Sequence, residues 1–191
     1  METLVLASQS PRRKELLSLA GIPFEADAPE VDESCTLSAG EAVKELSRRK
    51  AEAAALRHTG RFILAADTLV ALDGHSLGKP ASPEEARAML SSLSGRTHEV
   101  FTGVTVISPA GDCFTEEDCT RVTFCEIPPE EIDAYIRSGE PMDKAGAYGL
   151  QGHAGLWITR IEGSHTSVIG LPLYLARALL LKAGFPLAEK V

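Results

Sequence analysis

The chain has 191 residues and a formal net charge of −8 at pH 7, with 44% hydrophobic and 24% charged residues. This composition is typical of a globular domain with one sizeable core. The acidic balance argues against binding to a nucleic acid polymer, because such binding depends on basic groups that replace phosphate counterions. A small polyanion can still bind where cations are concentrated locally.

The apolar runs argue against a membrane-spanning segment, and the cysteines indicate a reducing compartment. No apolar run approaches the roughly 20 residues that span a bilayer, so we expect no membrane association. The cysteines form no CxxC pair and have no histidine at the spacing of a zinc site. We interpret them as free thiols in a reducing compartment, and the expected location is cytoplasmic. They are Cys35, Cys113, Cys119 and Cys125.

Hydrophobic periodicity and capping signals predict strands and helices along the whole chain. In chain order, we expect a strand over residues 3–7, a helix over 11–20, a strand near 24, a helix over 38–58, a strand within 61–72, a helix over 82–93, strands over 98–108 and 119–127, a helix over 128–139, a strand over 156–161 and a helix over 171–183. Ser38 and Glu41 match the capping-box pattern of a helix start, and Ser82 and Glu85 repeat it. Asp73-Gly74 is a hairpin-turn dipeptide, which makes the next strand antiparallel, so the sequence predicts a mixed α/β fold.

Two segments of the chain are predicted to be loops without regular structure. Residues 139–155 are dense in glycine, which suits backbone that lies close to a ligand but is also common in ordinary flexible loops. Residues 163–170 form a second, polar loop.

Two arginines, Arg12 and Arg13, stand in the first turn of the first expected helix. The positive end of the helix dipole disfavours cations there, by roughly a few tenths of a kcal/mol each. A bound anion would supply the missing negative charge, because helix N-termini and guanidinium groups both bind phosphate. The alternative is an exposed basic turn, and these residues alone favour neither interpretation.

Asp67 interrupts the apolar run of residues 62–72. A buried carboxylate is normally paired, hydrogen-bonded or bound to a metal ion, because an unpaired charge is costly to bury. The alternative is a carboxylate that caps a neighbouring loop. In the acidic loop further upstream, Glu30, Asp32 and Glu33 are equally plausible locally as ligands of a hard cation.

These features occur together in a known family. Residues 7–17, Ala-Ser-x-Ser-Pro-Arg-Arg-x-Glu-Leu-Leu, resemble the opening signature of the Maf family of nucleotide pyrophosphatases. Further matches follow in order: Glu33, Lys50, Ala66-Asp67-Thr68, Gly78-Lys79-Pro80, Leu93–His98, Ser138–Gly152 and Gly163–Leu173. The resemblance therefore covers most of the chain.

The resemblance implies metal-assisted hydrolysis of a nucleoside triphosphate between its α and β phosphates. It assigns catalysis to Asp67, Glu33 and Lys79, with Asp67 as proton acceptor and with Glu33 and Asp67 as ligands of Mg²⁺ or Mn²⁺. It assigns substrate binding to Ser8, Arg12, Arg13, Lys50, Thr68 and Gln151. Among these, Arg12, Thr68 and Gln151 are the positions that set base choice, and the Gln151 amide suits a pyrimidine edge because it both donates and accepts.

The same resemblance implies a single domain over residues 1–191, with two lobes around a central cleft, a strongly twisted mixed sheet flanked by helices, and a homodimer. Its fold would be similar to that of inosine triphosphate pyrophosphatases. The motifs at residues 66–68 and 143–151 resemble those of the dTTP/UTP pyrophosphatase subgroup. Three alternatives stay open: a 7-methyl-GTP pyrophosphatase, a house-cleaning enzyme for modified nucleotides that takes dTTP as a side substrate, and a nucleotide-sensing regulator of septum formation. The presence of both Glu33 and Asp67 favours an enzyme.

Overall fold

The computed structural model describes residues 2–187, so residue 1 and residues 188–191, the ends of the expected domain, lie outside the described residues. The described residues contain a seven-stranded sheet in the order β2-β1-β3-β5-β6-β7, with β4 paired to β3. The strands are β1 (Leu4–Leu6), β2 (Phe24–Ala26), β3 (Ile63–Leu72), β4 (His75–Leu77), β5 (Thr97–Ile107), β6 (Cys113–Phe124) and β7 (Ile158–Glu162). The α-helices are α1 (Pro11–Leu19), α2 (Ala39–Arg57), α3 (Pro83–Leu93), α4 (Pro129–Arg137), α5 (His165–Ile169) and α6 (Leu173–Lys182).

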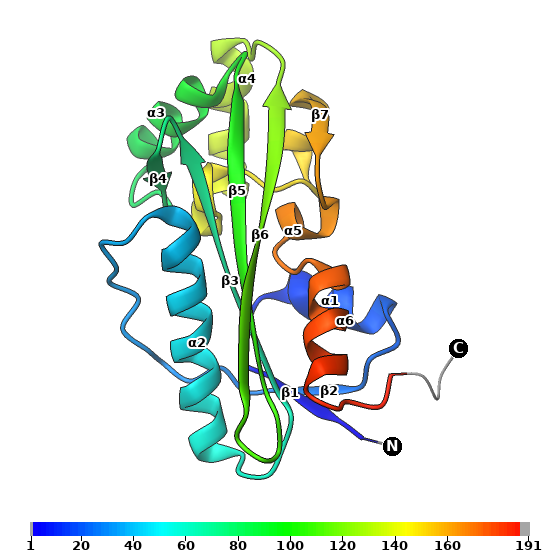
Figure 1. Ribbon diagram of the computed structural model, residues 1–191. Coiled ribbons are helices and arrows are strands. Elements are labelled where there is room, and N and C mark those ends of the chain that lie inside the picture. Colours follow the sequence, from blue (N-terminus) through cyan, green and yellow to red (C-terminus); the bar gives the residue numbers. More distant parts are fainter. Residues whose placement is uncertain (1, 188–191) are drawn as a thin grey trace.

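The sheet is mixed, as the hairpin signal predicts. Strand β1 pairs in parallel with β2 and β3, whereas β3, β5, β6 and β7 pair antiparallel. The twisted strands β5 and β6 run along the length of the molecule, with α2 beside them on one side and α1 and α6 on the other, while α3 and α4 lie at the upper end (Figure 1).

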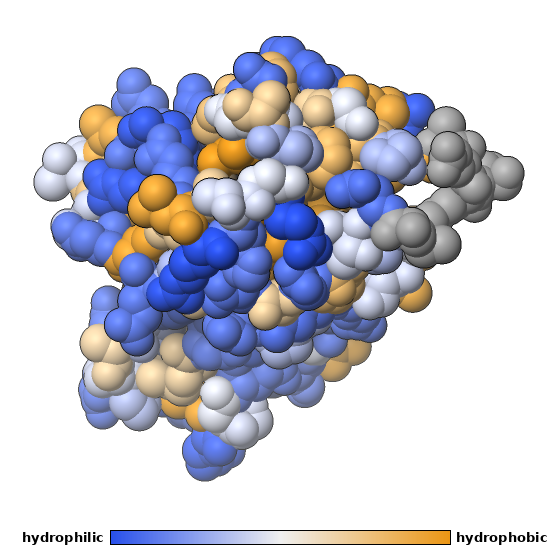
Figure 2. Space-filling model, turned by 90° about the horizontal axis from the view of Figure 1, so that it is seen from below, coloured by the Kyte–Doolittle hydropathy of each residue, from blue (hydrophilic) through white to orange (hydrophobic). Residues whose placement is uncertain are grey.

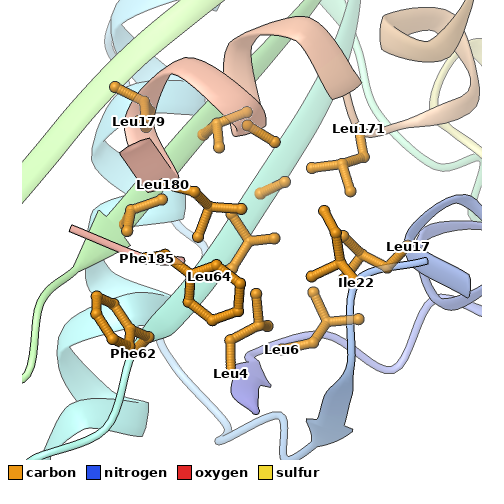
Figure 3. Close-up of a cluster of buried hydrophobic side chains, with 14 of the residues drawn as sticks. Leu4, Leu6, Leu17, Ile22, Phe62, Leu64, Leu171, Leu179, Leu180 and Phe185 are labelled. Atoms are coloured by element: carbon orange, nitrogen blue, oxygen red, sulfur yellow. The ribbon is translucent and has the colours of Figure 1, made fainter. Parts of the chain in front are cut away.

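Hydrophobic clusters on the two faces of the sheet hold the helices in place. One cluster packs α1 and α6 against β1 and β3, where Leu17 lies beside Ile22 and Leu180 lies near Leu64 (Figure 3). A second cluster lies at the upper end, where Trp157 and Tyr135 are among the largest fully buried side chains. Each large side chain buried in this way contributes roughly 1.5–3 kcal/mol.

Helix α2 approaches β5 so closely that only glycine fits between them. A Cβ on Gly103 would lie 2.2 Å from the carbonyl oxygen of Val43. This close approach brings the middle of α2 next to β3, and a third buried cluster, which includes Ala51, Ala54 and Ala65, forms between them. The small alanines therefore place Lys50 beside the centre of the sheet.

Several expected element boundaries differ in the structure. Strand β6 begins at Cys113 rather than at residue 119, because residues 113–118, most of them polar, still pair through their backbone with β5. The glycine-rich stretch contains three short 3-10 helices, η1 (Glu140–Asp143), η2 (Ala145–Ala147) and η3 (His153–Trp157). The expected loop over residues 163–170 contains helix α5, whose first turn is capped by the Ser164 hydroxyl accepting from the Ser167 N–H.

The two capping-box signals have different outcomes. At α3 the N-cap is confirmed, since the Glu85 N–H donates to Ser82 Oγ, while the Glu85 carboxylate accepts from the N–H of Ala81, one residue before the N-cap. At α2 the Ser38 hydroxyl instead donates directly to the Glu41 carboxylate, at 2.6 Å. The helix start is predicted correctly in both cases, but the capping interaction forms only in the first.

The surface at the lower end of the molecule is mixed in character. Seen from below, hydrophilic side chains predominate among the described residues, and hydrophobic ones lie between them (Figure 2). Such a mixture is usual for protein surface. Within residues 2–187, the helices are each too short or too polar to cross a membrane.

Candidate active site

A cavity of about 900 Å³ opens where several segments of the chain converge. Its wall is formed by the β1–α1 loop, the loop before α2, one side of α2, the middle of β3, the segment after β4, part of β5, residues 143–150 and the end of α5. The structure brings together eight of the residues that the sequence singles out: Ser8, Arg12, Arg13, Glu33, Lys50, Asp67, Thr68 and Lys79. Asp143, Lys144 and Tyr148 also line the cavity.

Lys50 joins two carboxylates that come from different segments. Its Nζ atom lies 2.6 Å from Asp67 Oδ1 and 2.7 Å from Glu33 Oε1. The side chains of Lys50 and Asp67 are only 15% and 12% exposed, whereas that of Glu33 is 58% exposed. The prediction that Asp67 is paired is therefore confirmed, and among the three acidic residues of the upstream loop it is Glu33 that meets this pair.

The positive charges around the cavity act on Glu33. The hydrogen bond from Lys50 lowers the pKa of the Glu33 carboxyl, and the charges of Lys50, Lys79 and Arg13 lower it further, against the opposing effect of burial. Lys79 lies just after β4, directly before Pro80, whose ring fixes the backbone there. The ionised form of Glu33 is thus favoured.

Arg13 is tied into the protein by three hydrogen bonds. Its Nε donates to the Gly170 carbonyl at 2.8 Å, its Nη1 to Ser8 Oγ at 3.1 Å and its Nη2 to Thr68 Oγ1 at 3.2 Å. A guanidinium has five N–H donors, so two remain for a ligand. Burial lowers the pKa of Arg13, while the nearby charge of Asp67 raises it.

Arg12 is much less constrained than its neighbour. Its one ion pair within residues 2–187 places Nη1 3.9 Å from Asp143 Oδ2, and its side chain is 30% exposed. The two arginines at the start of α1 therefore differ: Arg13 connects three segments of the fold, and Arg12 offers its guanidinium to the cavity. The helix dipole acts on both arginines alike, so it does not distinguish these roles.

Gln151 lies outside the set of residues that line the cavity within residues 2–187, although its neighbours Gly149 and Leu150 belong to it. The Gln151 side chain is exposed. Sequence reasoning thus finds the correct segment for the cavity wall, but the structure does not bring Gln151 together with the other site residues.

Lys144 and Tyr148 are cavity residues that sequence reasoning missed. The Lys144 side chain is 13% exposed, and its Nζ donates to Asp143 Oδ1 at 2.7 Å. A Cβ on Gly149 would lie 2.9 Å from Lys144 Cδ, so this glycine makes room for the lysine rather than for a ligand. Tyr148 is buried, and its hydroxyl lies 2.7 Å from Nε2 of His98. The sequence signal that could have identified Lys144 and Tyr148 is the presence of these polar residues inside a glycine-rich motif.

The carboxylates suit a divalent cation that is shared with a substrate. Within residues 2–187, no group of three or more His, Cys, Asp or Glu side chains is arranged to hold a metal ion by itself. However, Glu33 and Asp67 already converge on one positive atom, the Lys50 Nζ. Mg²⁺ commonly uses one or two carboxylates and completes its shell with water and substrate phosphate oxygens, so this donor set fits such an ion.

A cavity that combines five basic side chains with two converging carboxylates, set in a mixed α/β fold, defines a protein that binds a phosphorylated small molecule. The chain belongs to the Maf family, since the model described as "Maf-like protein" matches residues 3–183. A relative from Myxococcus xanthus named dTTP/UTP pyrophosphatase is 50% identical over 188 residues, covering 96% of this chain and 94% of its own. One of the same name from Symbiobacterium thermophilum is 47% identical over 189 residues, covering 98% and 97%.

Among solved structures, the Staphylococcus aureus Ham1 protein is similar over 64% of this chain and 72% of its own chain. Its sequence identity is 18% and the TM-score is 0.46.

Proposed function

We propose that this protein is a nucleoside triphosphate pyrophosphatase that hydrolyses dTTP and UTP to the monophosphate and pyrophosphate. The observation that carries the proposal is the convergence of Glu33 and Asp67 on Lys50 in a cavity that also contains Arg12, Arg13 and Lys79. The relatives that match nearly the whole chain and carry the name dTTP/UTP pyrophosphatase support the choice of substrate.

The basic side chains are proposed to bind the triphosphate. Arg12, Lys50 and Lys79 offset its negative charge and the charge that develops on the leaving pyrophosphate. Arg13 contributes its two remaining N–H donors, and its internal bonds hold Ser8 and Thr68 at the cavity wall. Lys50 would exchange at least one of its carboxylate partners for a phosphate oxygen when the substrate binds.

Glu33 and Asp67 are proposed to hold Mg²⁺ or Mn²⁺. Such an ion, when bound, polarises phosphate oxygens and makes a coordinated water more acidic. Asp67 accepts the proton of the attacking water at its carboxylate. The water oxygen then forms a bond to the α phosphorus, the bond from this phosphorus to the bridging oxygen breaks, and pyrophosphate leaves.

The base is proposed to be selected by Arg12, Thr68 and Gln151. The amide of Gln151 can pair with a pyrimidine edge because it has both a donor and an acceptor. Since this side chain lies outside the cavity wall, pairing requires residues 149–151 to bring it inward when the nucleotide binds.

The wider properties of the protein are also part of the proposal. We place residues 1–191 in a single domain with two lobes around the cavity. The four free cysteines suit a reducing compartment, and we propose the cytoplasm. A homodimer stays a prediction, which light scattering of the purified protein tests.

Hydrolysis of UTP in ¹⁸O-labelled water tests the reaction. We expect UMP and pyrophosphate as products, with the label in UMP, because attack occurs at the α phosphorus. Label in pyrophosphate would overturn the site of attack, and the absence of turnover with either Mg²⁺ or Mn²⁺ would overturn the proposed function itself. The Asp67→Asn protein is the matched control and should bind UTP without hydrolysing it.

A further inference from the structure

Glu33 stands in a stretch of chain that has no helix or strand to position it. Residues 27–38 connect β2 to α2 without regular structure, and the Glu33 side chain is largely exposed. A flexible side chain on such a segment loses conformational entropy when it is held in one place. A group that acts on a metal ion or a phosphate must nevertheless be held closely to its working geometry.

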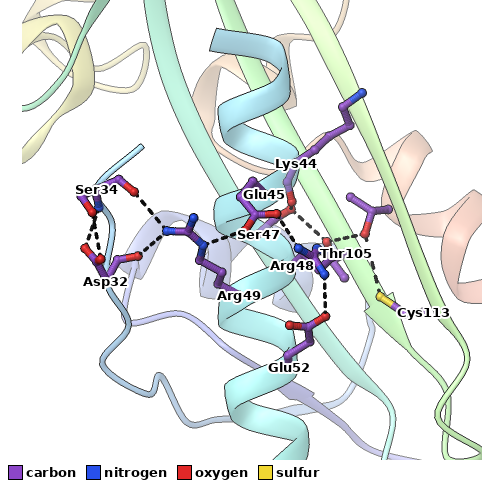
Figure 4. Close-up of polar contacts among 11 residues, drawn as sticks. Asp32, Ser34, Lys44, Glu45, Ser47, Arg48, Arg49, Glu52, Thr105 and Cys113 are labelled. Carbon is purple, nitrogen blue, oxygen red and sulfur yellow. Dashed lines mark hydrogen bonds and ion pairs between the residues drawn. The ribbon is translucent and has the colours of Figure 1, made fainter. Parts of the chain in front are cut away.

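Arg49 holds the backbone on both sides of Glu33. Its Nη1 atom donates to the Asp32 carbonyl at 3.0 Å and to the Ser34 carbonyl at 3.1 Å. Both bonds appear in Figure 4, where the arginine reaches from α2 to the loop. The guanidinium is itself fixed from the other side, since its Nε donates to Glu45 Oε1 at 2.8 Å.

The loop closes on itself at the same place. The Asp32 carboxylate accepts from the Ser34 N–H at 2.9 Å and from the Ser34 hydroxyl at 2.8 Å. This local turn brings the two carbonyls that flank Glu33 within reach of one nitrogen atom. The Arg49 contact and the turn therefore support each other.

Lys50, the next residue of α2, binds the carboxylate of Glu33. Consecutive residues of one helix thus hold Glu33 in two ways, Arg49 through the backbone and Lys50 through the side chain. Since Lys50 also binds Asp67, the position of the loop decides whether the two carboxylates meet.

We propose that Arg49 is a positioning residue for Glu33, which it keeps beside Asp67 by fixing the loop at Asp32 and Ser34. The inference rests on the proposed function, in which Glu33 acts on the metal ion. Arg49 does not line the cavity in the described part of the chain. Its effect is therefore on the metal and on turnover, not on nucleotide binding.

Arg48 is a matched control because it is adjacent and bears the same charge. It pairs with Glu45 at 2.6 Å and with Glu52 at 3.1 Å, and these contacts stay on the surface of α2 (Figure 4). Replacing Arg48 by Met therefore removes a cation and its helix ion pairs but leaves the hydrogen bonds from Arg49 to the loop in place.

The test compares Arg49→Met with Arg48→Met in two measurements. In steady-state UTP hydrolysis, Arg49→Met should raise the Mg²⁺ concentration that gives half-maximal activity by about tenfold, with the KM for UTP at saturating Mg²⁺ within about twofold of wild type. Arg48→Met should stay within about twofold of wild type in both quantities. Hydrogen exchange of the nucleotide-free proteins should be several-fold faster over residues 29–36 in Arg49→Met only.

The two measurements separate the inference from the function on which it rests. An unchanged exchange rate, or a change of equal size in both variants, would overturn the inference without any assay of turnover. Faster exchange together with a wild-type metal requirement would overturn the link to Glu33. If wild type fails to hydrolyse UTP, the proposed function fails, and the exchange data still report whether Arg49 fixes the loop.

Discussion

Lys50 and Asp67 form the most buried ion pair of the cavity, with Nζ 2.6 Å from Oδ1 and both side chains less than one-sixth exposed. The pair connects the middle of α2 to the centre of β3, so it contributes to the fold as well as to the site. Removal of one partner leaves the other as a buried charged group without its hydrogen bond.

Replacement of Lys50 by Met should therefore destabilise the protein by roughly 1–3 kcal/mol, the cost of an unsatisfied charged group in a partly enclosed site. The double variant Lys50→Met with Asp67→Asn should recover part of this loss, because no buried charge remains. Urea denaturation of the three proteins measures both quantities. A single variant as stable as wild type would show that the pair does not contribute to folding.

Glu33 should make the protein sensitive to acid. Its pKa is lowered in the folded state, chiefly by Lys50, so its contribution to stability is present above the pKa of the unfolded carboxyl group and is lost as pH falls through the folded value. Glu33→Gln should therefore lose less stability than wild type between pH 5 and the acid limit, roughly the range in which a carboxyl group titrates. The urea midpoint measured against pH gives the comparison, and parallel curves would contradict it.

His98 should give a second, separate pH dependence. Burial lowers the pKa of its imidazole to about 4, against an ordinary value of 6.5. The unfolded chain therefore binds a proton at a higher pH than the folded protein, and stability should fall by about 3 kcal/mol as pH drops from 6.5 to 4. His98→Gln, which keeps a polar group near Tyr148, should lack this decline. A decline of the same size in the variant would assign it to other groups.

Replacements of Arg12 and Arg13 should both weaken substrate binding but should differ in their effect on stability. Arg13→Met removes three hydrogen bonds between segments and should cost roughly 2–4 kcal/mol of stability in addition to raising the KM for UTP. Arg12→Met removes one long ion pair and should change stability by less than about 1 kcal/mol while still raising the KM. Thermal denaturation and steady-state kinetics of both variants test this contrast, which equal losses of stability would refute.

The sequence predicts the pairing of Asp67 in β3 correctly, because a buried charge inside an apolar run is normally paired, hydrogen-bonded or bound to a metal ion. It also predicts the mixed sheet in outline, since the hairpin turn and the helix starts are local signals. It places the start of β6 too late, because residues 113–118 are mostly polar and their pairing depends on the backbone of β5. Local patterns do not carry such long-range pairing.

The role of Arg13 shows the same limit at the site. The helix dipole explains why a cation at the start of α1 needs a negative partner. The partners of Arg13 include the carbonyl of Gly170, which is distant in the sequence. The arrangement of the sheet and α5 brings this carbonyl next to α1. For the same reason, the contacts of Arg49 around Glu33 depend on how α2 lies against the loop.

Pyrophosphate release from a panel of nucleoside triphosphates is the most direct test of the central claim. The wild-type protein is assayed with Mg²⁺ or Mn²⁺ against dTTP, UTP, CTP, ATP, GTP and 7-methyl-GTP, with Asp67→Asn as the control. We predict the highest kcat/KM for dTTP and UTP and no turnover by the control. A preference for 7-methyl-GTP, or an absence of turnover with all six nucleotides, would contradict the account.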